Sequence, residues 1–304
     1  MTEQQRPDHI TLAAFFATVL IGGLNFISVK LSNFELPPLF GAAVRFAAGA
    51  LIFFAIALVK RMDIPHGRAG SGSAVYGLLN FGLGYAFLYF ALTRLQVGTT
   101  SVIMALVPLL TLILAVLHRQ ERFTWRGLVG GLLALAGIAM LSLRSLGGQM
   151  PAIYMLAALG AAFAAAEAGV VVKGFPRAHP VTTNAVGMAI GAAALFVASL
   201  AFGEPWVIPR SGQTWLVLAW LVVAGSVGLF GLFVFVIKRW TASAAAYALT
   251  LMPVVAVATG SLIANEPITP EIIGGGALVI LGVYVGALTT PTARSRLRGK
   301  LLRL

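Results

Sequence analysis

Long apolar stretches, each close to the length of a membrane-spanning helix, alternate along the chain with short polar breaks. An α-helix rises 1.5 Å per residue, so about 20 mostly apolar residues are needed to cross the hydrocarbon core of a bilayer. The pattern predicts about ten spanning helices, five in each half. Their approximate ranges are 10–31, 36–59, 70–92, 97–117 and 124–143, then 152–174, 180–202, 213–237, 242–264 and 270–289.

Composition agrees with this pattern and narrows the class. Of the 304 residues 59% are hydrophobic and only 10% are charged, whereas soluble domains carry about 25% charged residues. We therefore expect an all-α polytopic membrane protein. The first apolar stretch lacks an A-x-A-like cleavage site and is interpreted as a retained helix. The net charge of +12 does not indicate nucleic-acid binding, because the basic residues lie between apolar runs rather than on one basic surface.

The segment 94–141 has a related copy later in the chain. Shifted by 145 positions, it aligns without a gap on residues 239–286. The identities are mostly residues that an apolar background does not supply: Arg94 with Arg239, Pro108 with Pro253, Glu121 with Glu266, Thr124 with Thr269, and Gly130, Gly131 and Gly137 with Gly275, Gly276 and Gly282. The repetition predicts two related halves, residues 1–147 and 148–304.

Five helices per half is an odd number, so the second half is predicted to enter the membrane from the opposite face. The halves are then inverted repeats, as in many secondary transporters, with the binding site near the midplane where they meet. With the N-terminus in the cytoplasm, 16 Lys and Arg residues fall on the inner side and 4 on the outer side. This bias predicts that both termini are cytoplasmic.

The two halves also resemble a known family. Each ends in a Pro-bearing helix, a short loop with Glu and a Gly-rich helix, which resembles the drug/metabolite transporter superfamily and, within it, the EamA-type branch. Pro37-Pro38 followed by Arg45-Phe46 is similar to the start of that family's second helix, whereas Met188 replaces the corresponding Arg in the second half. Within the branch the chain looks most like bacterial aromatic amino-acid exporters, which implies export across the inner (plasma) membrane.

Two prolines are candidate hinges. Pro108 and Pro253 each lie about 11 residues into a predicted helix, close to mid-bilayer. Proline frees a backbone carbonyl and bends a helix, so the pair is predicted to act as a hinge or gate beside a central cavity. The alternative is a static kink that serves packing.

Few charged residues lie within the predicted spans. Glu167 is the one carboxylate outside termini and loops. We expect it to face an aqueous cavity and bind a substrate ammonium or a proton; pairing with Arg45 fits poorly in depth, and a structural hydrogen bond is the alternative. Arg45 is expected to hold helix ends through backbone carbonyls. Lys30 and Lys173 occupy matching helix ends and are expected to extend to the interface.

An apolar or aromatic substrate needs stacking surfaces with polar ends. Asn25 is an amide within the first span, and Ser101 lies on the fourth span before Pro108. Tyr85 and Tyr89 lie one turn apart beside glycines, and Tyr247 lies at a similar depth. The predicted substrate-binding residues are Asn25, Tyr85, Tyr89, Ser101, Glu167 and Tyr247. The glycines of the fifth and tenth spans are expected to serve close helix packing, within one chain or between two.

We expect a secondary transporter that exports aromatic and other neutral amino acids by alternating access. The alternatives are a channel-like facilitator and an exporter of another small metabolite or drug. An intramembrane enzyme is disfavoured, because the chain has no cysteine and no His-Glu-x-x-His pattern. We expect no cofactor and no metal. The expected partners are a small-molecule substrate, the lipid bilayer and, for coupling, protons; monomer and homodimer both stay open.

Overall fold

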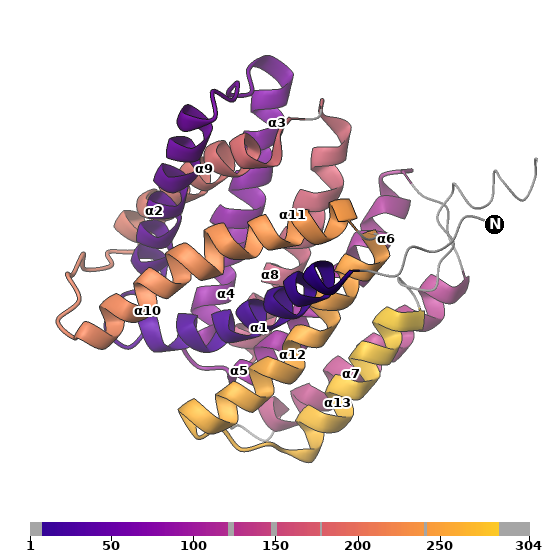
Figure 1. Cartoon of the computed structure of the whole chain (residues 1–304). Helices are drawn as coiled ribbons and strands as arrows, with labels where there is room; N and C mark the ends of the chain where they lie inside the picture. The colour runs from indigo at the N-terminus through magenta and orange to yellow at the C-terminus, as the bar shows by residue number, and fades with distance from the viewer. Residues whose placement is uncertain (1–7, 121–124, 147–150, 177, 240–241, 286–304) are drawn as a thin grey trace, which may run out of the picture.

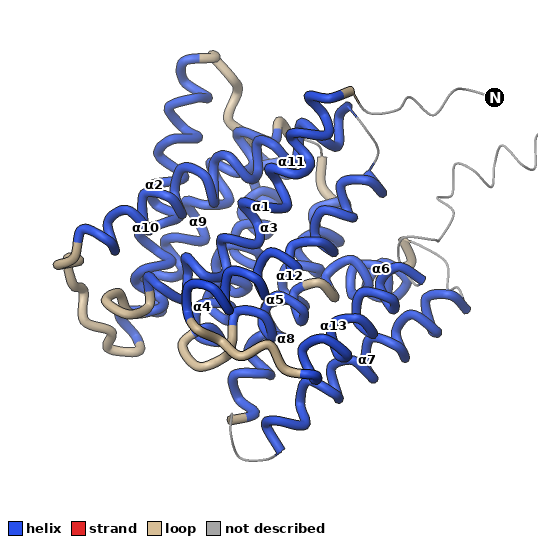
Figure 2. The backbone as a smooth tube through the Cα atoms, turned by 60° about the horizontal axis from the view of Figure 1, so that its bottom comes forward, coloured by secondary structure: helices blue, strands red, loops and turns tan. Residues whose placement is uncertain are grey.

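The protein is a bundle of helices (Figures 1 and 2). The computed structural model describes residues 8–120, 125–146, 151–176, 178–239 and 242–285, and no strand occurs within these ranges. Seven helical segments there are long and apolar enough to cross a membrane, and three shorter apolar helices accompany them. This confirms the predicted all-α membrane fold, with about ten spans.

In the first half, three spans are single helices and two are composite. The elements are α1 (His9–Ser32), α2 (Pro38–Val59), a third span made of α3 (Gly67–Gly77), the π-helix η1 (Leu78–Gly84) and α4 (Tyr85–Leu92), a fourth made of α5 (Val97–Met104) and α6 (Val107–Leu117), and α7 (Trp125–Leu146).

The second half follows a similar plan. Its elements are α8 (Ala152–Val171) with the short 3₁₀ turn η2 (Val172–Gly174), α9 (Pro180–Ala201), a span made of α10 (Gly212–Val222), the π-helix η3 (Val223–Gly228) and α11 (Leu229–Arg239), then α12 (Ala242–Ala264) and α13 (Pro270–Val283).

Local sequence explains where several helices begin. The Asp8 carboxylate accepts a hydrogen bond from Thr11 N at 2.8 Å, and the Thr269 hydroxyl accepts one from Ile272 N at 3.4 Å. Side-chain oxygens at this position satisfy backbone N–H groups that have no partner in the first turn. Proline stands in the first turn of α2, α9 and α13, where its missing N–H costs nothing.

The two π-helices were not predicted. They begin at Leu78 and Val223, which are 145 positions apart, the same offset as the repeated segment. A π-turn carries one extra residue and often occurs at functional sites. Both halves therefore distort the same span at the same place.

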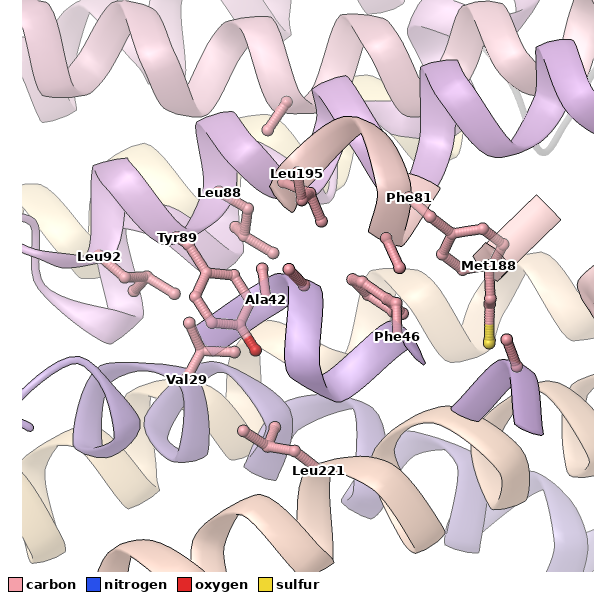
Figure 3. Packing of buried hydrophobic residues seen from close by; sticks show 14 of the residues in the cluster. Val29, Ala42, Phe46, Phe81, Leu88, Tyr89, Leu92, Met188, Leu195 and Leu221 are labelled. Atoms are coloured by element: carbon pink, nitrogen blue, oxygen red, sulfur yellow. The ribbon is translucent and has the colours of Figure 1, made fainter. Parts of the chain in front are cut away.

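The helices of the two halves pack in reciprocal pairs. The second span of each half packs on its counterpart, α2 on α9, and the fifth does so as well, α7 on α13 (Figure 1). α1 packs on α12, and the matching pair, α8 with α6, is also in contact. A hydrophobic cluster fills the region between α2, α4 and α9, and includes Phe46, Tyr89 and Met188 (Figure 3).

Glycines allow the α7–α13 contact. A Cβ on Gly137 would lie 2.6 Å from Gly275 O, and one on Gly282 would lie 2.5 Å from Gly130 O. Both distances are too short for a side chain, so these helices approach closely because of these glycines. The predicted packing role is confirmed for Gly137 and Gly282, within one chain.

Candidate functional site

A cavity of about 430 Å³ lies inside the bundle and is bordered by helices from both halves. The first half contributes α1, α2, the third span and the α5–α6 span, and the second half contributes α8, α11 and α12. Its aromatic lining residues are Phe26, Tyr76, Tyr85, Phe230 and Phe233. Its polar and charged lining residues are Asn25, Arg45, Asn80, Ser101 and Thr111. A mostly apolar pocket of this size with a few polar groups suits a small organic molecule.

Arg45 lines this cavity and is otherwise fully buried. Its Nε donates to Ser226 Oγ at 3.0 Å, its Nη2 donates to Gly225 O at 3.0 Å, and its Nη1 donates to the Tyr89 hydroxyl at 3.4 Å. Arg45 Cζ lies 5.2 Å from the Tyr85 ring centroid, within cation–π range. The guanidinium is thus held by α4 and by the second half of the chain.

The π-helix η3 prepares the acceptors for Arg45. Ser226 Oγ donates to Leu221 O, five residues earlier, at 2.9 Å. In a π-turn the regular backbone pattern is interrupted, so carbonyls become free for side chains. Gly225 O accepts hydrogen bonds from Arg45 and also from Asn25 Nδ2 at 3.0 Å. The distorted turn therefore joins α1 and α2 of the first half to the second half.

Three predicted binding residues lie at the cavity. Asn25 lines it, and its Oδ1 has no hydrogen-bond partner within the described part of the chain. Tyr85 and Ser101 also line it, although the Ser101 hydroxyl already donates to Gly98 O at 2.8 Å. The structure thus brings Asn25, Tyr85 and Ser101 together.

Two other predicted binding residues do not line the cavity. Tyr89 is fully buried and packs near Val29, Ala42 and Leu92 (Figure 3), with its hydroxyl turned to Arg45. Its place behind the lining differs from our expectation, because the wall on that side is formed by Tyr85 and Leu88. The side chain of Tyr247 on α12 lies outside the described residues.

Glu167 also departs from our expectation. Its neighbours Ala165 and Gly169 line the cavity, but Glu167 does not. Two helical positions correspond to a rotation of about 200°, which turns the carboxylate away toward α6. There Glu167 Oε1 lies 3.0 Å from Nε2 of His118, the C-cap of α6. The partner of Glu167 is therefore His118 and not Arg45, and its carboxylate does not face the cavity.

The two matching lysines differ from each other. Lys30 Nζ forms an ion pair with Glu266 Oε1 at 2.6 Å and donates to Leu95 O at 3.1 Å. Glu266 Oε2 also accepts from Val97 N, the first residue of α5, at 2.8 Å. Lys30 thus makes a bridge between helices instead of extending to the interface. Lys173 is exposed, as interfacial extension requires.

The two prolines also differ. The fourth span is broken at residues 105 and 106, just before Pro108, so Pro108 lies in the first turn of α6. Pro253 lies inside the continuous helix α12. The matching prolines therefore occupy different positions in their helices, the first turn of α6 and the interior of α12, and the hinge role stays a prediction.

Two polar residues of the site were missed by sequence reasoning. Asn80 lines the cavity and donates to the Tyr76 hydroxyl at 3.4 Å, and Ser226 holds Arg45. Both are polar residues in the middle of predicted spans, which is the signal that led to Asn25. Their burial could have been inferred in the same way.

An all-helical bundle with apolar spans and an internal cavity bordered by both halves defines a multi-pass membrane protein with a small-molecule site. The model of the EamA-like transporter family matches residues 9–143 and 152–287. The chain therefore belongs to the EamA-like transporter family, which confirms that part of the resemblance.

Relatives and a solved structure agree with this assignment. The chain is 27% identical over 284 residues to an uncharacterized transporter of Archaeoglobus fulgidus, covering 88% of this chain and 95% of that one. It is 26% identical to the uncharacterized inner membrane transporter YedA of Escherichia coli K12, with 90% and 91% covered. It is 28% identical to a probable amino-acid metabolite efflux pump of the same strain, with 88% and 91% covered. A crystal structure of another protein superposes with a TM-score of 0.66 over 93% of this chain and 99% of that one, at 20% identity, which shows the shared fold.

Proposed function

We propose that this protein is a secondary-active transporter of the inner membrane that exports small metabolites, with aromatic and other neutral amino acids as the first substrates to test. The observation that carries the proposal is the cavity between the two halves, deep in the bundle and lined by aromatic rings and a few polar groups. The name of the E. coli amino-acid metabolite efflux pump supports the substrate class and the direction.

The proposed mechanism is alternating access between inverted repeats. In such transporters one repeat rocks against the other around a site near the midplane. The reciprocal packing of α2 on α9 and α7 on α13, together with the two matches to the family model, supports a two-fold relation of this kind. The charge bias of the connections supports cytoplasmic termini.

Proton coupling would run through Glu167. Its Oε1 faces His118, whereas its Oε2 is buried without a hydrogen-bond partner in the described part of the chain. A carboxyl group within a membrane span is a candidate proton carrier. Glu167 lies on α8 between the lining residues Ala165 and Gly169, with its carboxylate on the opposite face of the helix.

Reconstituted protein tests the proposal directly. Proteoliposomes loaded with unlabelled phenylalanine should take up labelled phenylalanine by exchange, faster than protein-free liposomes. An outward or inward pH gradient should change the net rate, and Glu167→Gln should remove that change while exchange continues. Rates that do not saturate with concentration would instead indicate the channel-like facilitator, and no uptake of any neutral amino acid would refute the substrate class.

A further inference from the structure

The described lining of the cavity carries a positive charge and no negative charge. Arg45 is the one charged residue among the described residues that line it. The chain has nine Asp and Glu residues, and Glu167, which lies in the C-terminal half of α8, is turned away to His118. Positions 234, 237–247 and 250, which lie in α11, in α12 or between them and whose side chains are not described, include no Asp or Glu.

The partners of Arg45 satisfy its hydrogen bonds without neutralising its charge. They are the Ser226 hydroxyl, the Gly225 carbonyl and the Tyr89 hydroxyl, all neutral groups. A guanidinium has five N–H donors, so these three bonds leave two donors for another partner. A buried charge without a counter-ion is unfavourable, and an anionic ligand at this wall would relieve that cost.

The rest of the lining offers no anionic partner to a cationic ligand. Its polar residues Asn25, Asn80, Ser101 and Thr111 are neutral. The Tyr85 ring of the lining, which could hold an ammonium, already lies 5.2 Å from Arg45 Cζ. A ligand ammonium would therefore lose its water without gaining an anionic partner, and the guanidinium would repel it.

We propose that the cavity selects its ligand by charge: it binds molecules with an aromatic body and a lone carboxylate more tightly than the matching amino acids, and it rejects the matching amines. The carboxylate lies at Arg45 and the aromatic body lies among Tyr85, Phe230 and Phe233. The inference rests on the proposed function, in that it takes this cavity as the transport site, and it ranks the substrates that the function leaves open.

Three probes with the same phenyl body test the ranking: 3-phenylpropanoate, phenylalanine and phenethylamine, which near pH 7 are an anion, a zwitterion and a cation. Binding is measured by calorimetry on the full chain in nanodiscs of neutral lipid, with empty nanodiscs subtracted. We expect 3-phenylpropanoate to bind about tenfold more tightly than phenylalanine, and phenethylamine to bind at least about tenfold more weakly than phenylalanine. Phenethylamine or phenylalanine binding as tightly as 3-phenylpropanoate, or no binding of any probe, would overturn the proposal.

Two substitutions locate the effect. Arg45→Gln should bring the affinities of the three probes to within about threefold of one another, whereas Arg119→Gln, the same change at an exposed position, should preserve the ranking. Asn80→Asp places a carboxylate in the lining without changing the side-chain shape. Asn80→Asp should raise the affinity for phenylalanine relative to the affinity for 3-phenylpropanoate by about tenfold. Gln213→Glu, the matched change at an exposed position, should leave this ratio of affinities unchanged. Asn80→Asp keeps the test decisive if Arg45→Gln does not fold, and an unchanged ranking in Asn80→Asp counts against the proposal.

Binding and transport can fail separately. If the predicted ranking holds but proteoliposomes exchange no phenylalanine, the charge selection stands and the transport function falls. If phenylalanine is exchanged but phenethylamine binds best, the transport function stands and the charge selection falls.

Discussion

At the scale of single residues, Glu266 holds three segments together. It pairs with Lys30 at the end of α1 and accepts from Val97 N at the start of α5. The side chains of Lys30 and Glu266 are only 20% and 10% exposed, so solvent screens the pair less than it screens a surface pair.

We therefore expect Glu266→Gln and Lys30→Gln each to lower the free energy of unfolding by about 1–3 kcal/mol. The loss of unfolding free energy in the double variant should be clearly smaller than the sum of the two single losses, because either substitution alone already breaks the ion pair. Thermal unfolding of the four proteins in one detergent gives this comparison. Strictly additive losses would show that the two side chains do not interact.

Glu35, between α1 and α2, should give the protein a pH-dependent contact outside the spans. The Ser211 hydroxyl, and then the Ser211 and Arg210 backbone N–H groups, hold the pKa of the Glu35 carboxyl below its ordinary value. A lowered pKa in the folded state means that the contribution is complete above the unfolded pKa of about 4.3 and is lost as pH falls through the folded pKa.

Glu35→Gln should consequently lower the melting temperature at neutral pH, while the difference from wild type should shrink as the pH falls below about 4. Melting curves of both proteins across this range provide the measurement. A difference that stays constant with pH would mean that ionisation of Glu35 contributes nothing.

Sequence reasoning located part of the site at this scale. A polar or aromatic residue in mid-span was enough to place Asn25, Tyr85 and Ser101 near the cavity. It was not enough for Glu167 or Tyr89, because a helix presents its residues in all directions and the exact face depends on neighbouring helices. Arg45 was expected to hold backbone carbonyls, and Gly225 O is such a partner, but its place on η3 depends on a π-turn that composition does not mark.

At the scale of helices, the α7–α13 contact should depend on individual glycines. Gly137→Ala would place a Cβ 2.6 Å from Gly275 O, and the helices would have to separate. We expect a loss of about 1–3 kcal/mol in the free energy of unfolding. Gly131→Ala, where no atom lies within 4 Å, is the matched control in the same helix and should be neutral or slightly stabilising. Equal losses in both variants would contradict the packing role.

Replacing Pro108, which follows the break in the fourth span, should affect transport more than replacing Pro253 in α12. In Pro108→Ala the new N–H can donate to Met104 O and close the break at residues 105 and 106. One added backbone hydrogen bond stabilises the continuous helix by about 1 kcal/mol, or about fivefold in population.

We expect the exchange rate of Pro108→Ala to fall by about this factor if the broken form is part of the transport cycle. Pro253→Ala is the control, because α12 is already continuous; it should change the rate less. Equal rates for wild type and Pro108→Ala would make the break a packing feature alone.

Bilayer thickness explains why the spans were predictable and their interruptions were not. The required length constrains each apolar stretch, so most predicted ends lie within a few residues of the described helices. The π-helices and the break at residues 105 and 106 leave span length almost unchanged, although each π-helix carries one polar residue and two glycines. The conformation that such residues adopt depends on contacts between spans, which no single segment encodes.

At the scale of the whole molecule, the predicted topology can be measured without background labelling, because the chain contains no cysteine. Asp63→Cys lies between the second and third spans and Ile208→Cys between the seventh and eighth, both exposed. The charge bias predicts that Asp63→Cys is cytoplasmic and Ile208→Cys is not. An impermeant maleimide applied to intact cells should therefore label only Ile208→Cys. Labelling of both positions would contradict the predicted number of crossings.

The two π-helices have a bearing on the ancestry of the chain. They begin 145 positions apart, at the offset that superposes the repeated segment, so one event accounts for both more simply than two. The extra residue then entered a gene that encoded a single half, and was copied when that gene doubled and fused. The distortion that now supplies acceptors to Arg45 in one half is on this account older than the fused chain, and was inherited before the halves diverged to Arg45 and Met188.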